Sequence, residues 1–177
     1  MKKQGIIIFG ANGSGKTTLG CELARILGFK HMDIEDYYFE KSEIPYTVKR
    51  SREECLNLML ADIEKHGSFV LSAVTGNFGD VISQYYKLAV RLTAPNALRV
   101  ERVKRRCLEK FGEMNEQSLE FVDFVSTLSL EFIEQWSETL LCPVICVDGT
   151  KNWRANAKYI AEQCCKIQHN KKNRTVD

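Results

Sequence analysis

The octapeptide GANGSGKT at residues 10–17 constrains the fold of this chain more than any other feature. It matches the pattern G-x-x-x-x-G-K-[ST], in which a glycine-rich loop joins a β-strand to an α-helix. The apolar run Gln4–Phe9 precedes it, and apolar residues at helical spacing follow it over Lys16–Leu27. Strand, loop and helix therefore occur in the order that places a helix N-terminus at a bound phosphate.

The residue types of this loop suit a nucleoside triphosphate with Mg²⁺, so we expect ATP and Mg²⁺ as cofactors. Glycines let the backbone approach phosphate oxygens closely, and consecutive N–H groups then converge on the anion. Lys16 supplies a positive charge for the β- and γ-phosphates, and Thr17 supplies a hydroxyl ligand for the metal. The predicted nucleotide-binding residues of the loop are Gly10, Ala11, Asn12, Gly13, Ser14, Gly15, Lys16, Thr17 and Thr18.

Length and composition indicate one globular domain. The 177 residues include 44% apolar and 27% charged residues, which are ordinary globular values. No apolar run approaches the ~20 residues that span a bilayer, so no membrane association is expected. We predict a single domain over residues 1–168 and a flexible basic tail over residues 169–177.

The cysteines and the net charge bear on the cellular setting and the partners. Seven cysteines are scattered without a C-x-x-C pair, which indicates neither a disulfide framework nor a zinc site. Reduced thiols in the cytoplasm are the better interpretation. The net charge of +2 argues against nucleic acid as a partner, because domains that bind it usually carry a strong basic surface.

Apolar runs alternate with helical patterns along the whole chain, which is typical of parallel βαβ units. This pattern predicts an α/β fold, a three-layer α/β/α sandwich around a five-stranded parallel sheet. The predicted strands are Gln4–Phe9, Lys30–Ile34, Ser68–Ser72, Leu88–Leu92 and Val144–Val147. The predicted helices are Lys16–Leu27, Arg52–Lys65, Phe78–Tyr85, Asn96–Phe111, Glu116–Thr139 and Asn152–Gln168. Ligands of such sheets bind beyond the carboxyl ends of the strands.

The strand ends separate the classes of protein that share a phosphate loop. The third strand lacks the Asp-Glu pair of ATP-driven machines, and no N-K-x-D sequence for guanine recognition is present. The second strand instead ends in HMDIED, which places Asp33, Glu35 and Asp36 at the ligand-binding edge of the sheet.

With these motifs the chain resembles the small P-loop kinases of the shikimate kinase and adenylate (nucleoside monophosphate) kinase type. In shikimate kinase-like enzymes, a D-x-D at this strand end places one carboxylate near Mg²⁺ and another on the substrate hydroxyl. The resemblance implies the metal-side role for Asp33 and the acceptor-side role for Glu35, with Asp36 as its competitor. Asp36 also fits the N-cap of a following helix.

Two further segments match the substrate-binding regions of such kinases. Arg50-x-x-Glu53 has the spacing of their F-R-x-x-E, and a guanidinium suits a substrate phosphate or carboxylate. Ser51 caps the next helix in the alternative interpretation, which leaves Arg50 free to point at substrate. Gly76 and Asn77 follow the third strand where related kinases hold a glycine-rich substrate loop, although Asn77 equally fits a helix cap.

The helix after the fourth strand carries Arg102 and Arg106 on one face. In adenylate kinase-like enzymes, the first arginine of this R-x-x-x-R packs on adenine and the second reaches the transferred phosphates. A solvated basic helix face is the alternative. The lid after this helix is abbreviated, since only GEMNEQ separates it from the next predicted helix. The resemblance also implies that backbone atoms around Gly149 and Thr150 surround the adenine.

These features together predict an ATP-dependent phosphotransferase. Its acceptor is either a small hydroxylated compound or a nucleoside monophosphate, and the sequence does not choose between them. The alternative is a nucleotide-binding regulatory or adaptor protein without transfer activity, suggested by the short lid and the long apolar helix over residues 116–139. That helix also suggests a homodimer.

Overall fold

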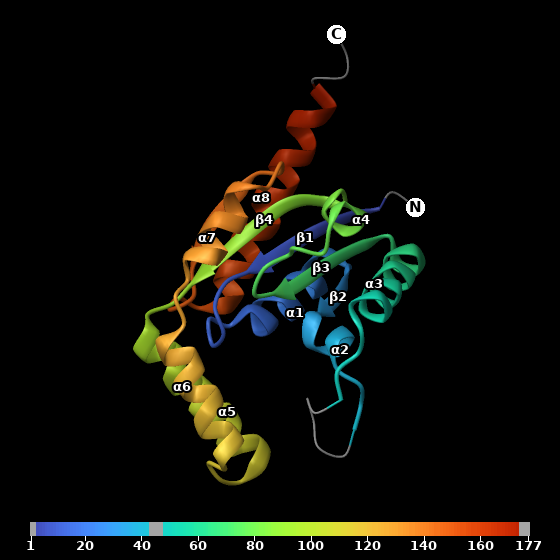
Figure 1. Ribbon diagram of the computed structural model, residues 1–177. Coiled ribbons are helices and arrows are strands. Elements are labelled where there is room, and N and C mark those ends of the chain that lie inside the picture. Colours follow the sequence, from blue (N-terminus) through green and yellow to red (C-terminus); the bar gives the residue numbers. More distant parts are fainter. Residues whose placement is uncertain (1–2, 43–47, 174–177) are drawn as a thin grey trace.

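The fold is built on a five-stranded, wholly parallel sheet with the strand order β2-β3-β1-β4-β5. The computed structural model describes residues 3–42 and 48–173. The strands are β1 (Gln4–Phe9), β2 (Lys30–Asp33), β3 (Ser68–Ala73), β4 (Tyr86–Thr93) and β5 (Val144–Asp148). Order and direction confirm the predicted α/β fold with its five parallel strands (Figure 1).

Helices cover both faces of the sheet and extend from its edge (Figure 1). They are α1 (Lys16–Leu27), α2 (Ile34–Tyr38), α3 (Arg52–His66), α4 (Asp80–Ser83), α5 (Asn96–Phe111), α6 (Glu116–Thr127), α7 (Glu131–Glu138) and α8 (Trp153–Asn173). Side chains of β1 alternate between two buried clusters, as the two-residue period of a strand requires. Ile6 and Ile8 pack with α1 and α8, whereas Ile7 and Phe9 pack with α3 and α7. The sheet is therefore the middle layer of three.

The predicted helix over residues 116–139 is wrong, because the segment forms two helices with different partners. Helix α6 packs Val122 and Val125 against α5, while Ile133 of α7 joins the cluster under β1. Between them Leu128 adopts an extended conformation, with φ −60° and ψ 120°. The apolar positions that suggested one continuous face thus serve two separate contacts.

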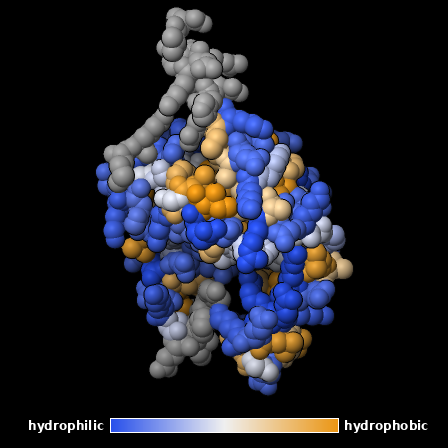
Figure 2. All heavy atoms as spheres, turned by 180° about the vertical axis from the view of Figure 1, so that it is seen from behind, coloured by the Kyte–Doolittle hydropathy of each residue, from blue (hydrophilic) through white to orange (hydrophobic). Residues whose placement is uncertain are grey.

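This division also weakens the basis of the homodimer hypothesis. Leu119 and Phe124 of α6 and Phe132 of α7 remain exposed, so dimerisation through these helices stays a prediction. The face of the molecule that is turned away in Figure 1 is largely hydrophilic, with apolar residues in small separate groups (Figure 2).

Two short helices also differ from the prediction. The helix expected over residues 78–85 is the four-residue α4, because Phe78 is buried ahead of it and Gly79, at φ 77°, begins it. Helix α2 is absent from the predicted helices, because its few residues show no helical repeat, and only the alternative interpretation of Asp36 as an N-cap implied a helix here.

The α5–α6 hairpin extends away from the sheet and carries the lid region (Figure 1). Gly112 ends α5 and Asn115 caps α6, so the connection between them is as short as the sequence predicted. Helix α8 continues to Asn173, beyond its predicted end, and residues 174–177 of the predicted tail lie outside the described residues. Within residues 3–42 and 48–173, none of the helices combines the length and the apolar character that crossing a bilayer requires.

Candidate active site

The predicted phosphate loop lies between β1 and α1 in a conformation that only glycine adopts easily. Gly10, Gly13 and Gly15 have φ angles of 145°, 80° and 102°. Gly15 precedes α1 without a side-chain cap, so the first N–H groups of the helix remain available to an anion. A Cβ on Gly13 would lie 2.4 Å from the Arg99 carbonyl oxygen. The loop is therefore held against α5 at a point where no side chain fits.

A pair of glycine substitutions tests this close approach. Gly112→Ala should lower the free energy of unfolding by about 1–2 kcal/mol, the usual cost of a left-handed conformation. Gly13→Ala should cost about 1–3 kcal/mol more, because the backbone of the loop or of α5 must also shift. Gly112 is the matched control, since its φ of 76° resembles that of Gly13 but no atom lies within 4 Å of the position that a Cβ would take there. Urea denaturation measures both values, and equal losses would contradict the close contact.

Lys16 lies at the centre of the site, at the first position of α1. Its ammonium group donates a hydrogen bond to the carbonyl oxygen of Ala11, over 3.0 Å. Burial lowers the pKa of Lys16 to about 8, and the nearby carboxylates of Glu35 and Asp33 oppose that shift. A polyanion bound in the loop would supply negative charge that stabilises the buried ammonium group of Lys16.

Thr17 and Asp33 form the arrangement expected for a metal-binding pair. The Thr17 hydroxyl donates to Asp33 Oδ2 over 2.6 Å, which joins α1 to the carboxyl end of β2. No cluster of three or more His, Cys, Asp or Glu side chains suited to a metal occurs among the described residues. This oxygen pair fits Mg²⁺, which typically binds through one or two protein groups and completes its shell with water and substrate phosphates.

Asp33 also begins helix α2 and thereby sets the positions of the other two carboxylates. Its Oδ1 accepts a hydrogen bond from the Glu35 N–H over 3.1 Å, so Asp33 is the N-cap of the helix. The expectation that Asp36 caps this helix is therefore wrong. Asp36 is exposed in the first turn, whereas Glu35 lines a cavity described below.

Two arginines of α5 donate hydrogen bonds to backbone carbonyl groups of the phosphate loop. Arg99 is buried and donates to the Asn12 carbonyl oxygen over 3.4 Å. Arg102 donates to the carbonyl oxygens of Ser14, over 3.2 Å, and Gly149, over 2.9 Å. Arg102 thus fastens the phosphate loop to the turn after β5. Its predicted contact with adenine stays a prediction.

A cavity of about 430 Å³, here called the loop cavity, lies between the phosphate loop, α5 and the start of α8. It contains the backbone of residues 13–15 and is lined by Trp153. Its charged lining residues are mostly cationic, namely Arg102, Arg105, Arg106 and Lys151, with Glu109 as the acidic one among the described residues. This cavity has the charge and the position that a nucleotide would need.

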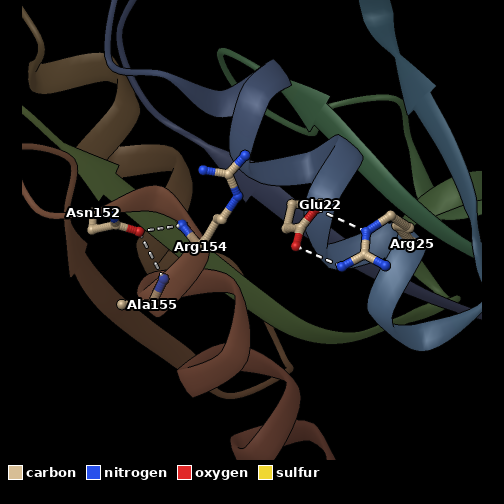
Figure 3. Close-up of polar contacts among 5 residues, drawn as sticks. All are labelled: Glu22, Arg25, Asn152, Arg154 and Ala155. Carbon is tan, nitrogen blue, oxygen red and sulfur yellow. Dashed lines mark hydrogen bonds and ion pairs between the residues drawn. The ribbon is translucent and has the colours of Figure 1, made fainter.

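The start of α8 fixes the wall of the loop cavity. Asn152 Oδ1 accepts hydrogen bonds from the N–H groups of Arg154, over 2.9 Å, and Ala155, over 3.2 Å (Figure 3). The Arg154 guanidinium lies 4.1 Å from the centroid of the Trp153 ring, which it covers. The indole is thereby held by a cation–π contact.

The turn after β5 brings one of its two predicted nucleotide contacts to the loop cavity. Gly149 lines it, and its N–H donates to the Thr93 carbonyl oxygen over 2.7 Å. Thr150 is exposed and does not line it. The Thr150 hydroxyl and N–H instead donate to Asp148 Oδ1, over 2.7 and 2.9 Å.

A second cavity of about 510 Å³, here called the hairpin cavity, lies between α2 and the α5–α6 hairpin. Asn12 of the phosphate loop, Glu35 of α2 and Arg106 of α5 contribute to its wall. Further lining side chains include Phe39, Cys107, Lys110, Phe111, Ser118 and Phe121. Arg106 lines both cavities, and each cavity also borders the phosphate loop, through Asn12 in one and residues 13–15 in the other, so the two are adjacent.

Arg50 is not free to point at substrate, contrary to the prediction. Its Nη1 donates to the carbonyl oxygens of Asp36 and Tyr37, each over 3.1 Å, and of Phe39, over 2.5 Å. The guanidinium therefore satisfies the open end of α2. Ser51, by contrast, caps α3 as the alternative interpretation expected, in a capping box with Glu54.

The structure does not bring Gly76 and Asn77 to either cavity beside the phosphate loop. Both residues line a separate cavity of about 650 Å³, where a Cβ on Gly76 would lie 2.8 Å from the Tyr86 hydroxyl and 2.9 Å from the Trp136 ring. Asn77 is exposed, and its carbonyl oxygen accepts from Arg52 over 3.3 Å. Asn77 is not a helix cap either, because Gly79 is the N-cap of α4.

Several lining residues were not predicted from the sequence. Lys110 could have been identified, because it lies one turn beyond Arg106 on the same helix. Trp153 is not among the predicted nucleotide contacts, although it closely follows the predicted adenine turn. Ser118 and Phe121 lie on α6, whose packing against α5 depends on contacts that the sequence pattern did not reveal.

The fold and the phosphate loop define this protein as a P-loop NTPase with the fold of the small kinases of nucleoside monophosphate kinase-like type. A family model described as "AAA domain" matches residues 6–120, and the chain belongs to this family. The chain is also 30% identical to uncharacterized protein YqaC of Bacillus subtilis strain 168, over 82% of this chain and 89% of that protein.

Solved structures of kinases share the fold at low sequence identity. Shikimate kinase from Acinetobacter baumannii, in complex with shikimate, matches with a TM-score of 0.57 and 19% identity. The match covers 93% of this chain and 94% of the other. Deoxyadenosine kinase from M. mycoides, with bound dATP, matches with a TM-score of 0.56 and 14% identity, over 91% and 99% of the two chains.

Proposed function

We propose that this protein is an ATP-dependent phosphotransferase, which moves the γ-phosphoryl group of Mg-ATP to a hydroxyl group of a small molecule. The observation that carries the proposal is the presence of two adjacent cavities beside one phosphate loop, with Arg106 in the wall of both. A protein that only binds a nucleotide needs one such cavity. A transferase needs a donor side and an acceptor side that meet where the phosphoryl group moves.

On the donor side, the phosphate loop and Lys16 would hold the phosphates, and Thr17 and Asp33 would hold Mg²⁺. The metal neutralises charge on the phosphoryl oxygens when it is bound. The nucleoside would occupy the loop cavity between Arg102, Gly149 and Trp153. Backbone amides and fixed cations suit this task, because phosphoryl transfer depends mainly on positioning and charge stabilisation.

On the acceptor side, Glu35 is the carboxylate that we assign to the acceptor hydroxyl. It lines the hairpin cavity, and its charge acts on Lys16, which links it electrostatically to the phosphate site. Asp36 lies outside that cavity. Glu35 would orient the hydroxyl and accept its proton as the new P–O bond forms to the acceptor and the bond to ADP breaks.

The test of this function is ADP formation that depends on an added acceptor. The protein is incubated with Mg-ATP and a panel of alcohols, nucleosides and nucleoside monophosphates, and ADP and phosphorylated products are measured. Acceptor-dependent ADP with a matching product supports the transferase. Tight ATP binding without turnover on any compound would favour the nucleotide-binding adaptor instead. Failure of ATP to bind at all would overturn both.

Lys16 gives ATP binding a characteristic pH dependence. Its pKa of about 8 lies below the ordinary lysine value in the free protein, and bound phosphates should raise it. At about pH 7 the lysine is protonated before and after binding, whereas at about pH 9 binding must take up a proton. We therefore expect Mg-ATP affinity to fall as the pH rises through about 8. Calorimetry in buffers of different ionisation enthalpy measures the uptake, which should be detectable at the higher pH only.

A further inference from the structure

The charged groups of the hairpin cavity balance one another. Glu35 and Glu120 carry negative charge, and Arg106 and Lys110 carry positive charge. Lys110 lies 5.3 Å from the centroid of the Phe111 ring, and the charge of Glu35 acts on it. Among the described residues the lining thus carries no excess positive charge, and such a wall offers little attraction to an anion beyond the phosphoryl group that is transferred there.

The arginine that the sequence suggested for an additional anionic group is engaged elsewhere. Arg50 donates to carbonyl oxygens at the end of α2 and does not line the hairpin cavity. Recognition of a substrate phosphate or carboxylate typically uses a guanidinium fork, and Arg50 presents none to the hairpin cavity because it does not line it. Arg106, which faces both cavities, serves the transferred group in the proposed function.

Three aromatic side chains contribute to the remaining wall of the cavity, beside the uncharged residues Asn12, Cys107, Gln117 and Ser118. Phe39 follows α2, Phe111 ends α5, and Phe121 belongs to α6, so rings from separate elements surround the same space. Phe121 is itself stacked on Phe124, with ring centroids 6.4 Å apart and planes at 20°. Such walls favour a ligand with a flat apolar face, because aromatic rings stack and also release bound water.

A buried hydroxyl group completes this environment. Ser118 is only 2% exposed and lines the cavity, and its Oγ has no hydrogen-bond partner among the described residues. The Ser118 N–H donates a hydrogen bond to Asn115 Oδ1 over 2.9 Å, so only the hydroxyl of this residue lacks a partner among the described residues. An unpaired buried hydroxyl is costly. Because the Oγ atom is itself buried, a polar atom of a bound ligand would satisfy it once the Ser118 side chain turns toward the cavity.

We infer that the phosphoryl acceptor is a neutral alcohol that carries an aromatic or other flat apolar group, and not a nucleoside monophosphate. This inference rests on the proposed function and chooses between the two acceptor classes that the sequence leaves open. The balanced charges and the engaged Arg50 disfavour a second anionic group. The aromatic wall and the Ser118 hydroxyl favour a flat molecule with at least one further polar atom.

Binding measurements test the ligand class without requiring transfer. The loop cavity is first saturated with Mg²⁺ and a non-transferable ATP analogue. Nucleosides, 2-phenylethanol, nucleoside 5′-monophosphates and myo-inositol are then compared by saturation-transfer NMR and calorimetry. At least one neutral flat compound should bind about tenfold more tightly than its phosphorylated counterpart and than myo-inositol. Preference for a monophosphate or for myo-inositol would overturn the inference, as would no binding by any neutral flat compound.

Two variants locate this binding in the hairpin cavity. Phe121→Ala should weaken the neutral flat ligand about tenfold. Glu35→Gln leaves excess positive charge, so it should improve monophosphate binding about fivefold relative to the nucleoside. Asp36→Asn is the matched control, because this neighbouring carboxylate is exposed outside the cavity and its removal should change neither affinity. If Glu35→Gln and Asp36→Asn behave alike and Phe121→Ala binds normally, the cavity is not the site.

The ADP assay distinguishes failure of the proposed phosphotransferase activity from failure of the inferred acceptor class. Transfer to a monophosphate acceptor would retain the phosphotransferase and overturn the inferred acceptor class. Binding of a neutral flat ligand in the hairpin cavity without any ADP formation would retain the ligand class and overturn the phosphotransferase.

Discussion

Asp33→Asn should lower kcat/KM for Mg-ATP about 10²-fold and shift the Mg²⁺ dependence to higher concentrations. Asp33 accepts a hydrogen bond from the Thr17 hydroxyl over 2.6 Å, at the place where we propose that the metal binds. An amide keeps the size of the side chain and removes its negative charge. The loss should therefore arise from weaker support of Mg²⁺ and not from a changed shape of the site.

The substitution Asp33→Asn should remove the charge without disturbing the role of this residue as the N-cap of α2. Asn is as good an N-cap as Asp, so helix α2 should keep its hydrogen bond from the Glu35 N–H and its thermal stability. Asp36→Asn is the control, because it removes an equal charge from the same helix at an exposed position. Steady-state ADP formation at several Mg²⁺ concentrations provides the comparison. Equal losses in both variants would mean that general electrostatics, and not metal support, explains the effect.

The phosphate loop and the sheet could be predicted because both are local in the sequence. Glycines at fixed spacing determine the loop conformation, and Lys16 and Thr17 occupy the first positions of the helix that follows. Each strand is a short apolar run between turn residues, so its identity depends little on distant contacts. Parallel strands are then expected, because helical segments connect strands that are consecutive in the sequence.

The acceptor side could not be predicted because it depends on which polar groups meet in space. The spacing of Arg50 and Glu53 suggested a free guanidinium, but helix α2 was not visible as a pattern, so its unpaired carbonyl groups were not foreseen. Gly76 suggested a substrate contact beside the phosphate loop, but it packs against Tyr86 and Trp136 at a separate cavity that contains no residue of that loop. In both cases a residue distant in sequence decides what the motif does.

The same dependence explains how the structure separates Glu35 from Asp36. Both carboxylates follow the same strand, and the sequence pattern allows either of them to face the acceptor. Once Asp33 caps α2, the helical turn directs adjacent positions to different sides, since neighbouring residues on a helix do not share a face. Glu35 then lines the hairpin cavity, and Asp36 is exposed.

Arg106→Met should have the largest effect, a fall in kcat of about 10³-fold with the Kd for Mg-ATP changed less than about fivefold. Arg106 lines both cavities, and its charge acts on Lys16 and Lys110, which places it between the donor and acceptor sides. A cation there would stabilise charge on the phosphoryl group as it moves, more than it stabilises bound ATP. Methionine keeps much of the side-chain volume and the helix propensity, so the charge is the main change.

Arg105→Met is the matched control for this prediction. Arg105 is the adjacent residue of α5, lines only the loop cavity, and lies 3.7 Å from Glu109 in an exposed ion pair. Its removal should alter turnover only a few-fold, because exposed ion pairs contribute little. Single-turnover measurements at saturating Mg-ATP and acceptor separate the transfer step from binding. A larger loss for Arg105→Met than for Arg106→Met would show that the shared wall of the two cavities is not where the phosphoryl group passes.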